Sequence, residues 1–550
     1  MLLEGILLPD DYVNLSRQII STTGGLPLAL EVIGSLVYRQ NKASWYDVLD
    51  NLREIPHEKV QDKLKISYNA LNHEQQQIFL DIACLFVDKD KTNALYMWKD
   101  CGFRPDHSIQ VLVCMSLIKI TDHNKFWMHD QLRDLGRKIV HGDTRPTDPR
   151  KQSRLWDPET ADNIIGTKER KKHIEAICLW ETRVYTSKEF SRLPNIRFLM
   201  LVGGNFSGDF ENHFSELRYM TCTWVSREFL AINFHPSNLV VLKPSYSSIT
   251  EEWAGWSQFK VAKKLKVLDI SHCSNMTRTP NFSDYLSLER LNLEDCKKLT
   301  EVDGSLKKLK CLIYFNAHGC ENLRELPKGI GGLHKLKYLY LGRCEKLRKL
   351  PKSFARVTSL VELDLSHTAI TRLPDSIGNQ NRFWKEVQLN RLEQLVEFDM
   401  YNSDLEGFSG LSNLKRLKRL TLHKCQNLTA IQGLGSLDSL EQLNIIICPK
   451  IGSLDDLSNL KKLQFLKISS CEVLQAVKGL DELETLTTLF FVNCRSLKSF
   501  LNVFNSKVLD ECFLNITGCP NLEAESFGGT VSMYKERKVR GKRRKRNRGV

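Results

Sequence analysis

Residues 265–273 read Leu265-Lys-Val-Leu268-Asp-Ile270-Ser-His-Cys273, and this pattern, L-x-x-L-x-L-x-x-C, decides the fold of most of the chain. Its centre, x-L-x-L-x, alternates buried and exposed positions, which predicts a short β-strand with one apolar face. One such strand cannot bury that face alone, whereas stacked copies share a continuous core. The pattern recurs from residue 174 almost to the end of the sequence.

The copies of the pattern follow one another at about 24 residues, which is the spacing of leucine-rich repeats. They begin at Ile174, Ile196, Leu217, Leu239, Leu265, Leu288, Leu312, Leu336, Leu360, Leu395, Leu417, Leu440, Leu463, Leu486 and Glu511. One longer interval, after Leu360, predicts an insertion around Asn379–Gln388. We therefore expect an α/β protein in which about 15 repeats form a leucine-rich-repeat solenoid, a horseshoe lined by a parallel β-sheet.

Cysteine occupies the ninth position of most copies of the pattern. The residues concerned are Cys273, Cys296, Cys320, Cys344, Cys425, Cys448, Cys471, Cys494 and Cys519. Metal binding or redox chemistry is one interpretation, but the chain has no CxxC pair and these thiols recur singly, one per repeat. Buried thiols that pack at the turn of each coil are the preferred interpretation. Free buried thiols indicate a reducing compartment, and we expect a cytoplasmic protein with no metal site.

The net charge of +14 comes mostly from the end of the chain. Residues 535–550 hold ten Lys or Arg and one Glu, so the body is only mildly basic. The densest part of this tail consists of Lys542, Arg543, Arg544, Lys545, Arg546 and Arg548. It indicates nuclear import, or non-specific contact with nucleic acid or anionic lipid, and a solvated end is the alternative. No apolar run is long enough to cross a bilayer.

The sequence before the repeats reads as helices followed by a hairpin. Pro27 suits the first position of a helix, and Asn72-x-x-Gln75 resembles a capping box at the start of another. Two short strands around residues 122–124 then precede a last helix, an order that predicts a winged-helix unit. The expected organisation is a helical region at 1–55, a winged-helix domain at 56–145, a linker at 146–172, repeats at 173–530 and a basic tail at 531–550.

Short stretches of this N-terminal part occur in an order known from one family. They are Gly24-Gly25-Leu26-Pro27-Leu28-Ala29-Leu30, Leu64-x-Ile66-Ser67-Tyr68, Ile78-Phe79-Leu80-Asp81-Ile82-Ala83-Cys84 and Met128-His129-Asp130. Together with the cysteine-bearing repeats, they resemble plant intracellular nucleotide-binding leucine-rich-repeat disease resistance proteins of the TIR class. The resemblance covers nearly the whole chain except the tail. It implies that residues 1–55 are the C-terminal helical part of the nucleotide-binding (NB-ARC) module.

The resemblance also implies a nucleotide site, with ADP or ATP as the ligand of the parent family. It places Gly25, Leu26 and Pro27 near the adenine, and His129 near the β-phosphate. Met128 and Asp130 complete the motif that reports the state of the switch. Asp130 suits the cap of the following helix, and the N-terminus of a helix favours anions beside His129. The structural alternatives are that Pro27 only starts a helix and that His129 is only a hydrogen-bonded residue at a domain seam.

The sequence departs from that family at its phosphate-binding loop. The string G-x-x-x-x-G-K-[ST], which would cradle the phosphates, does not occur, and the TIR domain with its NAD⁺-cleaving glutamate is absent. We therefore expect no enzymatic activity, and weak or no ADP binding by this chain alone.

Partner binding is expected on the concave face, where the x residues of each strand face solvent. Aromatic and arginine side chains are frequent interface anchors. The candidates in the middle repeats are Arg290, Tyr314, His318, Tyr338, Tyr340 and Arg343, and those in later repeats are Phe465 and Phe490, next to Ile446 and Ile447.

Three functions follow as hypotheses. The preferred one is part of a plant immune receptor whose repeats recognise a pathogen effector or a guarded host protein and regulate an ADP/ATP switch supplied by an upstream nucleotide-binding half. A protein-binding scaffold or decoy without nucleotide is the alternative. An adaptor for ubiquitin transfer is disfavoured because Gly25-Leu26-Pro27 and the stretches after it do not suit an F-box.

Overall fold

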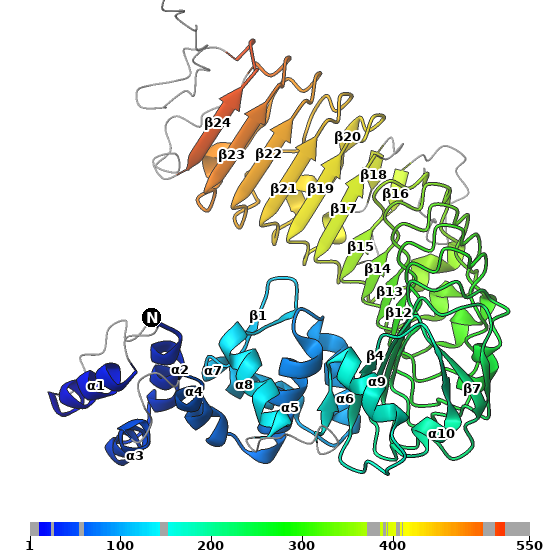
Figure 1. The fold of residues 1–550 in the computed structure, drawn as a ribbon. Coiled ribbons are helices and arrows are strands. Elements are labelled where there is room, and N and C mark those ends of the chain that lie inside the picture. The colour runs from blue at the N-terminus through cyan, green and yellow to red at the C-terminus, as the bar shows by residue number, and fades with distance from the viewer. Residues whose placement is uncertain are drawn as a thin grey trace, which may run out of the picture. The chain divides into compact units, whose positions relative to one another are not determined.

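Helices begin the chain, as the sequence predicts. The computed structural model describes residues 10–23, 27–53, 60–142, 152–370, 386–388, 392, 394–402, 407–409, 411–498 and 512–522. The first helices are α1 (Asp10–Thr22), α2 (Pro27–Val37), α3 (Lys42–Arg53) and α4 (Val60–Asn69) (Figure 1). Pro27 is the first residue of α2, as expected. A small core of buried side chains joins α1, α2 and α3 and contains Leu15, Ile19, Ile33, Val37, Leu49 and Leu52.

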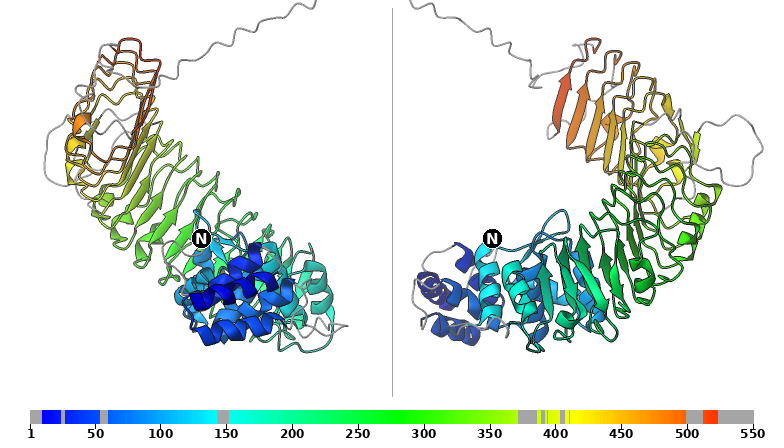
Figure 2. Two further views of the ribbon diagram at one scale, coloured as in Figure 1. Left: turned by 90° about the vertical axis from the view of Figure 1, so that its left-hand side faces the viewer. Right: turned by 45° about the vertical axis from the view of Figure 1, so that its right-hand side comes forward.

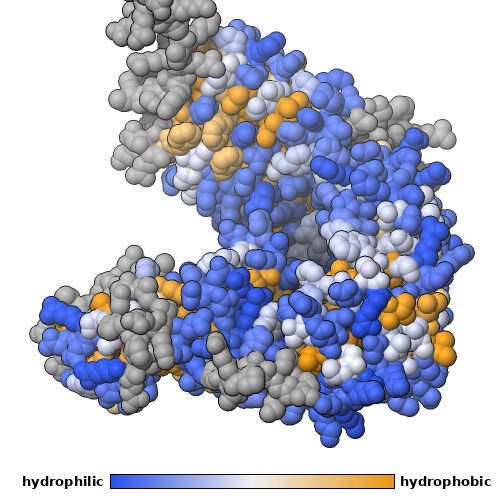
Figure 3. Space-filling view, in the orientation of Figure 1, coloured by the Kyte–Doolittle hydropathy of each residue, from blue (hydrophilic) through white to orange (hydrophobic). Residues whose placement is uncertain are grey.

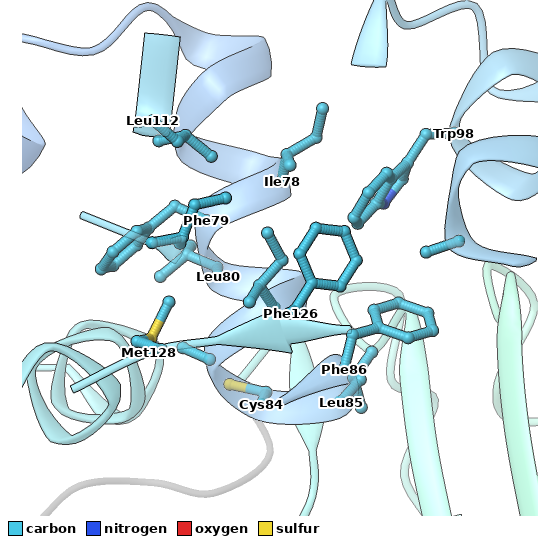
Figure 4. Packing of buried hydrophobic residues seen from close by; sticks show 14 of the residues in the cluster. Ile78, Phe79, Leu80, Cys84, Leu85, Phe86, Trp98, Leu112, Phe126 and Met128 are labelled. Atoms are coloured by element: carbon cyan, nitrogen blue, oxygen red, sulfur yellow. The ribbon is translucent and has the colours of Figure 1, made fainter. Parts of the chain in front are cut away.

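The winged-helix unit follows. It consists of α5 (His73–Asp81), the π-helical turn η1 (Ile82–Phe86), α6 (Lys91–Asp100), α7 (Pro105–Cys114), the antiparallel pair β1 (Lys119–Ile120) and β2 (Phe126–Trp127), and α8 (Asp130–His141). The expected capping box is present: Asn72 accepts from the Gln75 N–H, and the Gln75 side chain accepts from the Asn72 N–H. Phe79, Trp98 and Phe126 fill the centre of this unit (Figure 4).

The chain divides into two compact units, residues 1–276 with 282–291, and residues 277–281 with 292–550. In the first unit, parallel strands follow the winged helix in the order β3 (Arg154–Leu155), β4 (Ala176–Leu179), β6 (Phe198–Val202), β8 (Tyr219–Thr223), β10 (Val241–Lys243) and β11 (Val267–Asp269). A second small sheet contains β5 (Val184–Thr186), β7 (Asn205–Asp209) and β9 (Leu230–Ile232). Strand β12 (Arg290–Asn292) lies where the two units meet in the sequence.

Two features of the first unit differ from the expected organisation. The stretch expected as a linker, 146–172, contains β3 and helix α9 (Pro158–Gly166), and β3 pairs with β4. The division between units also falls inside the repeats rather than near residue 146. The reason is that the apolar core of the winged helix continues into the strands: Phe86 contacts Phe198 and Tyr219 with ring centroids 5.5 and 5.6 Å apart.

In the second unit the repeats form a parallel sheet. Its strands, in spatial order, are β13 (Tyr314–Asn316), β14 (Tyr338–Tyr340), β15 (Glu362–Asp364), β17 (Glu397–Tyr401), β19 (Arg419–His423), β21 (Gln442–Ile446), β22 (Phe465–Ser469), β23 (Thr488–Val492) and β24 (Phe513–Thr517). They lie side by side along one face of the unit, and the return segments run along the other (Figures 1 and 2). Short 3₁₀ turns such as η4 (Ile330–Gly332) and η5 (Lys352–Arg356) occur in these returns.

The pattern in the sequence therefore identifies the strands. Each expected start is followed two residues later by the first residue of a strand, from β4 to β24. The expected architecture of a helical region, a winged-helix unit and a leucine-rich-repeat solenoid with a parallel sheet is confirmed. The interval after Leu360 holds β16 (Glu386–Gln388), which pairs with β18 (Gly407–Ser409). Other residues of the expected insertion lie outside the described ranges.

From the repeat that starts at Ile196 onward, each coil turns at the eighth position of the pattern, and the backbone there is left-handed. Glycine fills this position at Gly319, but Asp295, Arg343 and Ile447 adopt it too, with φ of 54°, 56° and 55°. The N–H of the turning residue donates to a carbonyl of the next coil, as from Ile447 to Ser469 at 2.7 Å. This bond satisfies a buried backbone donor at the turn and fixes the coils relative to each other.

The ninth-position cysteines pack directly behind these turns. All sixteen cysteines of the chain are free thiols. The thiols of Cys320 and Cys344 donate to the carbonyls of Leu293 and Ala317 in the preceding coil, at 3.1 and 3.2 Å. Burial raises the pKa of Cys344 to about 12, so this thiol stays protonated. Within the described ranges, no group of three or more His, Cys, Asp or Glu side chains is placed to hold a metal ion.

Candidate functional site

A small cavity lies beside the motif residues of the helical region and the winged helix. Its volume is about 170 Å³. Pro27, Leu28 and Glu31 of α2 form one wall, and the other walls come from Ser116, Leu117, Ile118, Lys119, Trp127 and His129. The structure thus brings two predicted nucleotide-site residues, Pro27 and His129, to one cavity. Gly25 and Leu26 lie outside the described residues.

His129 has a different local role from the expected one. Helix α8 begins at Asp130, and the residue that caps it is His129, whose Nδ1 accepts from the Gln131 N–H at 3.2 Å. The prediction that Asp130 caps this helix is therefore wrong: as the first helical residue, Asp130 instead pairs with Arg133 at 2.8 Å. Since Nδ1 accepts, the proton of the neutral ring is on Nε2, which remains a donor. Met128 is buried in the core.

The cavity wall combines hydrogen-bond donors with one carboxylate, that of Glu31. Besides Nε2–H of His129, it contains the start of α2, where the first N–H groups have no partner within the helix. Lys119 adds an ammonium group, which pairs with Glu31 at 3.0 Å and lies 5.4 Å from the Trp127 ring. A volume of about 170 Å³ is below the roughly 300–1,000 Å³ of small-molecule sites, so these residues would hold only part of a nucleotide.

A buried ion cluster connects the winged helix to the repeats. We call it the Asp81 cluster; it contains Asp81, Trp98, Arg154 and Arg197. Asp81, at the end of α5, accepts from Arg154 Nε at 2.7 Å and from Arg197 Nη2 at 2.8 Å. The Trp98 indole donates to its other oxygen at 2.7 Å. Asp81 is fully buried, and the Arg154 side chain is 1% exposed.

The charges of the Asp81 cluster depend on one another. Burial alone would raise the pKa of Asp81, but the Arg154 and Arg197 guanidinium groups outweigh it and lower the pKa. Arg197 also reaches Glu175 at 3.0 Å. Because Arg154 lies on β3 and Arg197 precedes β6, the cluster joins α5 to the first coils of the solenoid.

Asp81 is not among the site residues predicted from the sequence. An aspartate within the apolar run Ile78–Cys84 was a usable signal, since a buried charge requires a partner. Its partners are 73 and 116 residues away, so the sequence alone does not identify them.

The open sheet face of the second unit carries most of the predicted partner residues. This name refers to the side chains of the first and third residues of each strand in the second unit's sheet, from β13 to β24. It also includes the side chains of the segment just after each strand. The ring centroid of Tyr314 lies 6.5 Å from that of Tyr338 and 5.6 Å from that of Tyr340. His318 Nδ1 lies 3.5 Å from Asp364 Oδ2, across the space left by Gly342.

The remaining predicted partner residues are distributed along the repeats. Phe465 and Phe490 stand 5.7 Å apart and continue to Phe513, where apolar side chains gather over β22–β24 (Figure 3). Arg343 is exposed at a left-handed turn. Arg290, on β12, is half-buried and belongs to the first unit. The basic residues from Lys542 to Arg548 lie outside the described ranges.

Comparisons with known proteins match the fold and these motifs. Residues 72–144 match the winged-helix domain of Roq1-like disease resistance proteins, and residues 264–424 match a leucine-rich repeat region. The chain is therefore a winged-helix and leucine-rich-repeat protein.

Its curated relatives are plant disease resistance proteins. It is 30% identical to the TMV resistance protein N of Nicotiana glutinosa over 54% of this chain and 26% of that protein. It is 31% identical to disease resistance protein RPP2A of Arabidopsis thaliana, over 54% and 23%. The resemblance to plant disease resistance proteins is confirmed. The chain spans about a quarter of the length of these relatives.

Some solved structures align with this chain at low identity. A leucine-rich-repeat protein of Leptospira interrogans, LIC12759, aligns with a TM-score of 0.39 and 18% identity, over 68% of this chain and 96% of that one. The Toll–Spatzle complex of Drosophila aligns with a TM-score of 0.43 and 15% identity, over 59% and 45%. Among the described residues, no helix is long and apolar enough to cross a membrane.

Proposed function

We propose that this chain is the regulatory and recognition part of a plant immune receptor. Its repeats bind a pathogen effector or a guarded host protein, and that binding controls an ADP/ATP switch in a nucleotide-binding half. The Asp81 cluster is the observation that carries the proposal. It connects the winged helix, which bears His129, to the first coils of the solenoid through buried ion pairs. Separating these ion pairs would cost several kcal/mol of free energy. The free buried thiols support a cytoplasmic location.

In this mechanism the Pro27–His129 cavity senses the nucleotide. His129 Nε2–H would donate to a phosphate oxygen, while Nδ1 stays engaged with Gln131 and keeps the ring oriented. Pro27 would pack against the base. Bound ADP would supply the negative charge that the start of α2 and His129 stabilise. Partner binding on the repeats then shifts the balance between a closed state, in which the motif is held at the nucleotide, and an open state.

Titration calorimetry with ADP tests this proposal on a fusion of the chain to the nucleotide-binding half of a relative such as the N protein. We expect binding that weakens about tenfold in His129→Ala, which corresponds to about 1.4 kcal/mol. His123→Ala is the matched control, because His123 is exposed in the hairpin turn. No ADP binding by the fusion, or equal effects of the two substitutions, would favour the scaffold.

The alternative is a protein-binding scaffold or decoy without a nucleotide. The small cavity volume favours this alternative, because about 170 Å³ does not enclose ADP. For the chain on its own we expect ADP binding too weak for calorimetry at micromolar concentrations. The fusion experiment therefore decides between the two functions.

A further inference from the structure

One part of the open sheet face combines tyrosines with carboxylates. Tyr338 stands directly opposite Glu362 on the next strand, and Glu362 stands opposite Glu397. Two residues further along the strands, Asp364 stands opposite Asp399. We call the set Tyr338, Glu362, Asp364, Glu397 and Asp399 the tyrosine–carboxylate face.

The four carboxylates of this face repel one another. Neighbouring strands are about 4.8 Å apart, and like charges in direct register destabilise a sheet. Burial raises the pKa of Glu397, and the carboxylates of Glu362 and Asp399 raise it further. Burial likewise raises the pKa of Asp399, and Asp364 and Glu362 add to the shift. Ionisation of Glu397 and Asp399 is therefore disfavoured, whereas hydrogen bonds from His318 and Ser366 lower the pKa of Asp364 and keep it charged.

Among the described residues, two positively charged or titratable groups lie against these carboxylates. Arg419 pairs with Glu397 at 3.0 Å, and His318 lies 3.5 Å from Asp364. Glu362 accepts from the Tyr340 hydroxyl, which is neutral. Oδ1 of Asp399 is buried and has no hydrogen-bond partner in the described part of the chain. In the ranges that the structure describes, one arginine and one titratable histidine thus pair with the four carboxylates.

We propose that the tyrosine–carboxylate face binds a basic segment of the partner protein, with an arginine seated between the Tyr338 ring and the carboxylates of Glu362 and Glu397. This inference rests on the proposed function, in which the repeats recognise a protein, and it names the chemistry of that protein. Charge complementarity carries it: a cation relieves the repulsion among the carboxylates, whereas nucleic acid would be repelled.

Arginine suits this face better than lysine for two physical reasons. Its planar fork donates to two carboxylate oxygens at once, and register holds Glu362 and Glu397 side by side. It also stacks on aromatic rings, and Tyr338 lies next to these carboxylates in the same row. A lysine ammonium makes neither the forked nor the stacked contact.

Fluorescence anisotropy of the full chain with labelled peptides of about twelve residues tests the inference. The probes alternate Ser with Arg, with Lys or with Glu. We expect the Arg peptide to bind most tightly and the Glu peptide not to bind. Binding should weaken steeply from about 50 to about 300 mM salt, because the carboxylates are partly exposed. Glu362→Gln with Glu397→Gln should weaken binding about tenfold, and Tyr338→Ala about fivefold.

Glu472→Gln with Glu484→Gln is the matched control, since both residues are exposed on return segments and the charge change is the same. An equal loss in this control would show that only net charge matters and would overturn the inference. So would binding that appears only after residues 535–550 are deleted, because the chain's own basic segment would then be the occupant. Circular dichroism verifies that each variant is folded.

The peptide experiment and the ADP experiment fail independently. If the chain binds the Arg peptide but the fusion binds no ADP, the inference about the tyrosine–carboxylate face stands and the proposed receptor function is contradicted. If the fusion binds ADP through His129 but the full chain does not bind the Arg peptide, the proposed receptor function stands. The inference that this face is its recognition surface is then contradicted.

Discussion

Replacing Asp81 by asparagine tests whether the winged helix and the first coils form one cooperative unit. Asparagine keeps the size of the side chain but removes its charge. Arg154 and Arg197 would then be buried beside a neutral amide. The NH₂ of that amide is a donor, so it would face the N–H donors of the two arginines instead of accepting from them. Removing one partner of a buried ion pair costs about 3–5 kcal/mol, because the remaining charge is left uncompensated.

The size of the expected shift follows from the size of the unit. For units of about 150–250 residues, 1 kcal/mol changes the melting temperature by roughly 2–4 °C, and the larger first unit lies near the lower value. We therefore expect Asp81→Asn to lower the first unit's melting temperature by roughly 5–10 °C in differential scanning calorimetry. Hydrogen exchange should accelerate together in the β1–β2 hairpin and in β4 and β6.

A control variant with the same chemistry separates burial from charge. Asp106 pairs with Lys99 at 2.8 Å on the surface of the same winged helix, and both side chains are more than half exposed. Asp106→Asn should cost about 0–1 kcal/mol. If Asp81→Asn costs no more than this control, or if exchange rises in the hairpin while β4 and β6 stay protected, the reasoning about the Asp81 cluster is refuted.

Three further predictions concern the repeats. Gly342→Ala should lower stability by about 1–3 kcal/mol in urea unfolding, because a Cβ there would lie 2.4 Å from Asp364 Oδ2 and 2.5 Å from His318 Nδ1. Asp364 raises the pKa of His318, so the stability that this pair contributes is present below about pH 6.5 and is lost as pH rises through the folded-state pKa. Gly342→Ala should lack this pH dependence, which unfolding at several pH values measures. Ile447→Asn should raise stability by about 1 kcal/mol, since a β-branched residue at φ 55° is strained and asparagine is not; an unchanged urea midpoint would contradict this. Asp399→Asn should raise the melting temperature at neutral pH and leave it unchanged in acid, because a raised folded-state pKa means that ionisation disfavours the folded state; a lower melting temperature at pH 7 would contradict the repulsion described above.

The repeats were predictable because their information is local. A strand with a period of two, a turn at the eighth position and a cysteine at the ninth are all within one nine-residue window. Strand β3 was missed because Gln152-Ser-Arg154-Leu155 lacks the leucine spacing of the other copies. Its place in the sheet comes from its neighbour β4, and Arg154 points to Asp81 rather than to solvent.

The candidate sites were predictable only in part. Pro27 and His129 reach one cavity because the winged helix packs against α2, a contact that no local pattern encodes. The cap of α8 was assigned to Asp130 because aspartate is the more common capping residue, whereas the chain enters the helix one residue earlier. The Asp81 cluster depends on contacts over a hundred residues apart, so only a three-dimensional structure identifies it.

The left-handed turns have a consequence for how such chains change over generations. At turns such as Ser470 the N–H donates to the adjoining coil, here to the carbonyl of Val492. A whole coil can therefore be duplicated or deleted by unequal recombination, and the new neighbours meet with the same donor and acceptor already in place. A chain built in this way can vary the number and order of its coils without having to evolve a new fold.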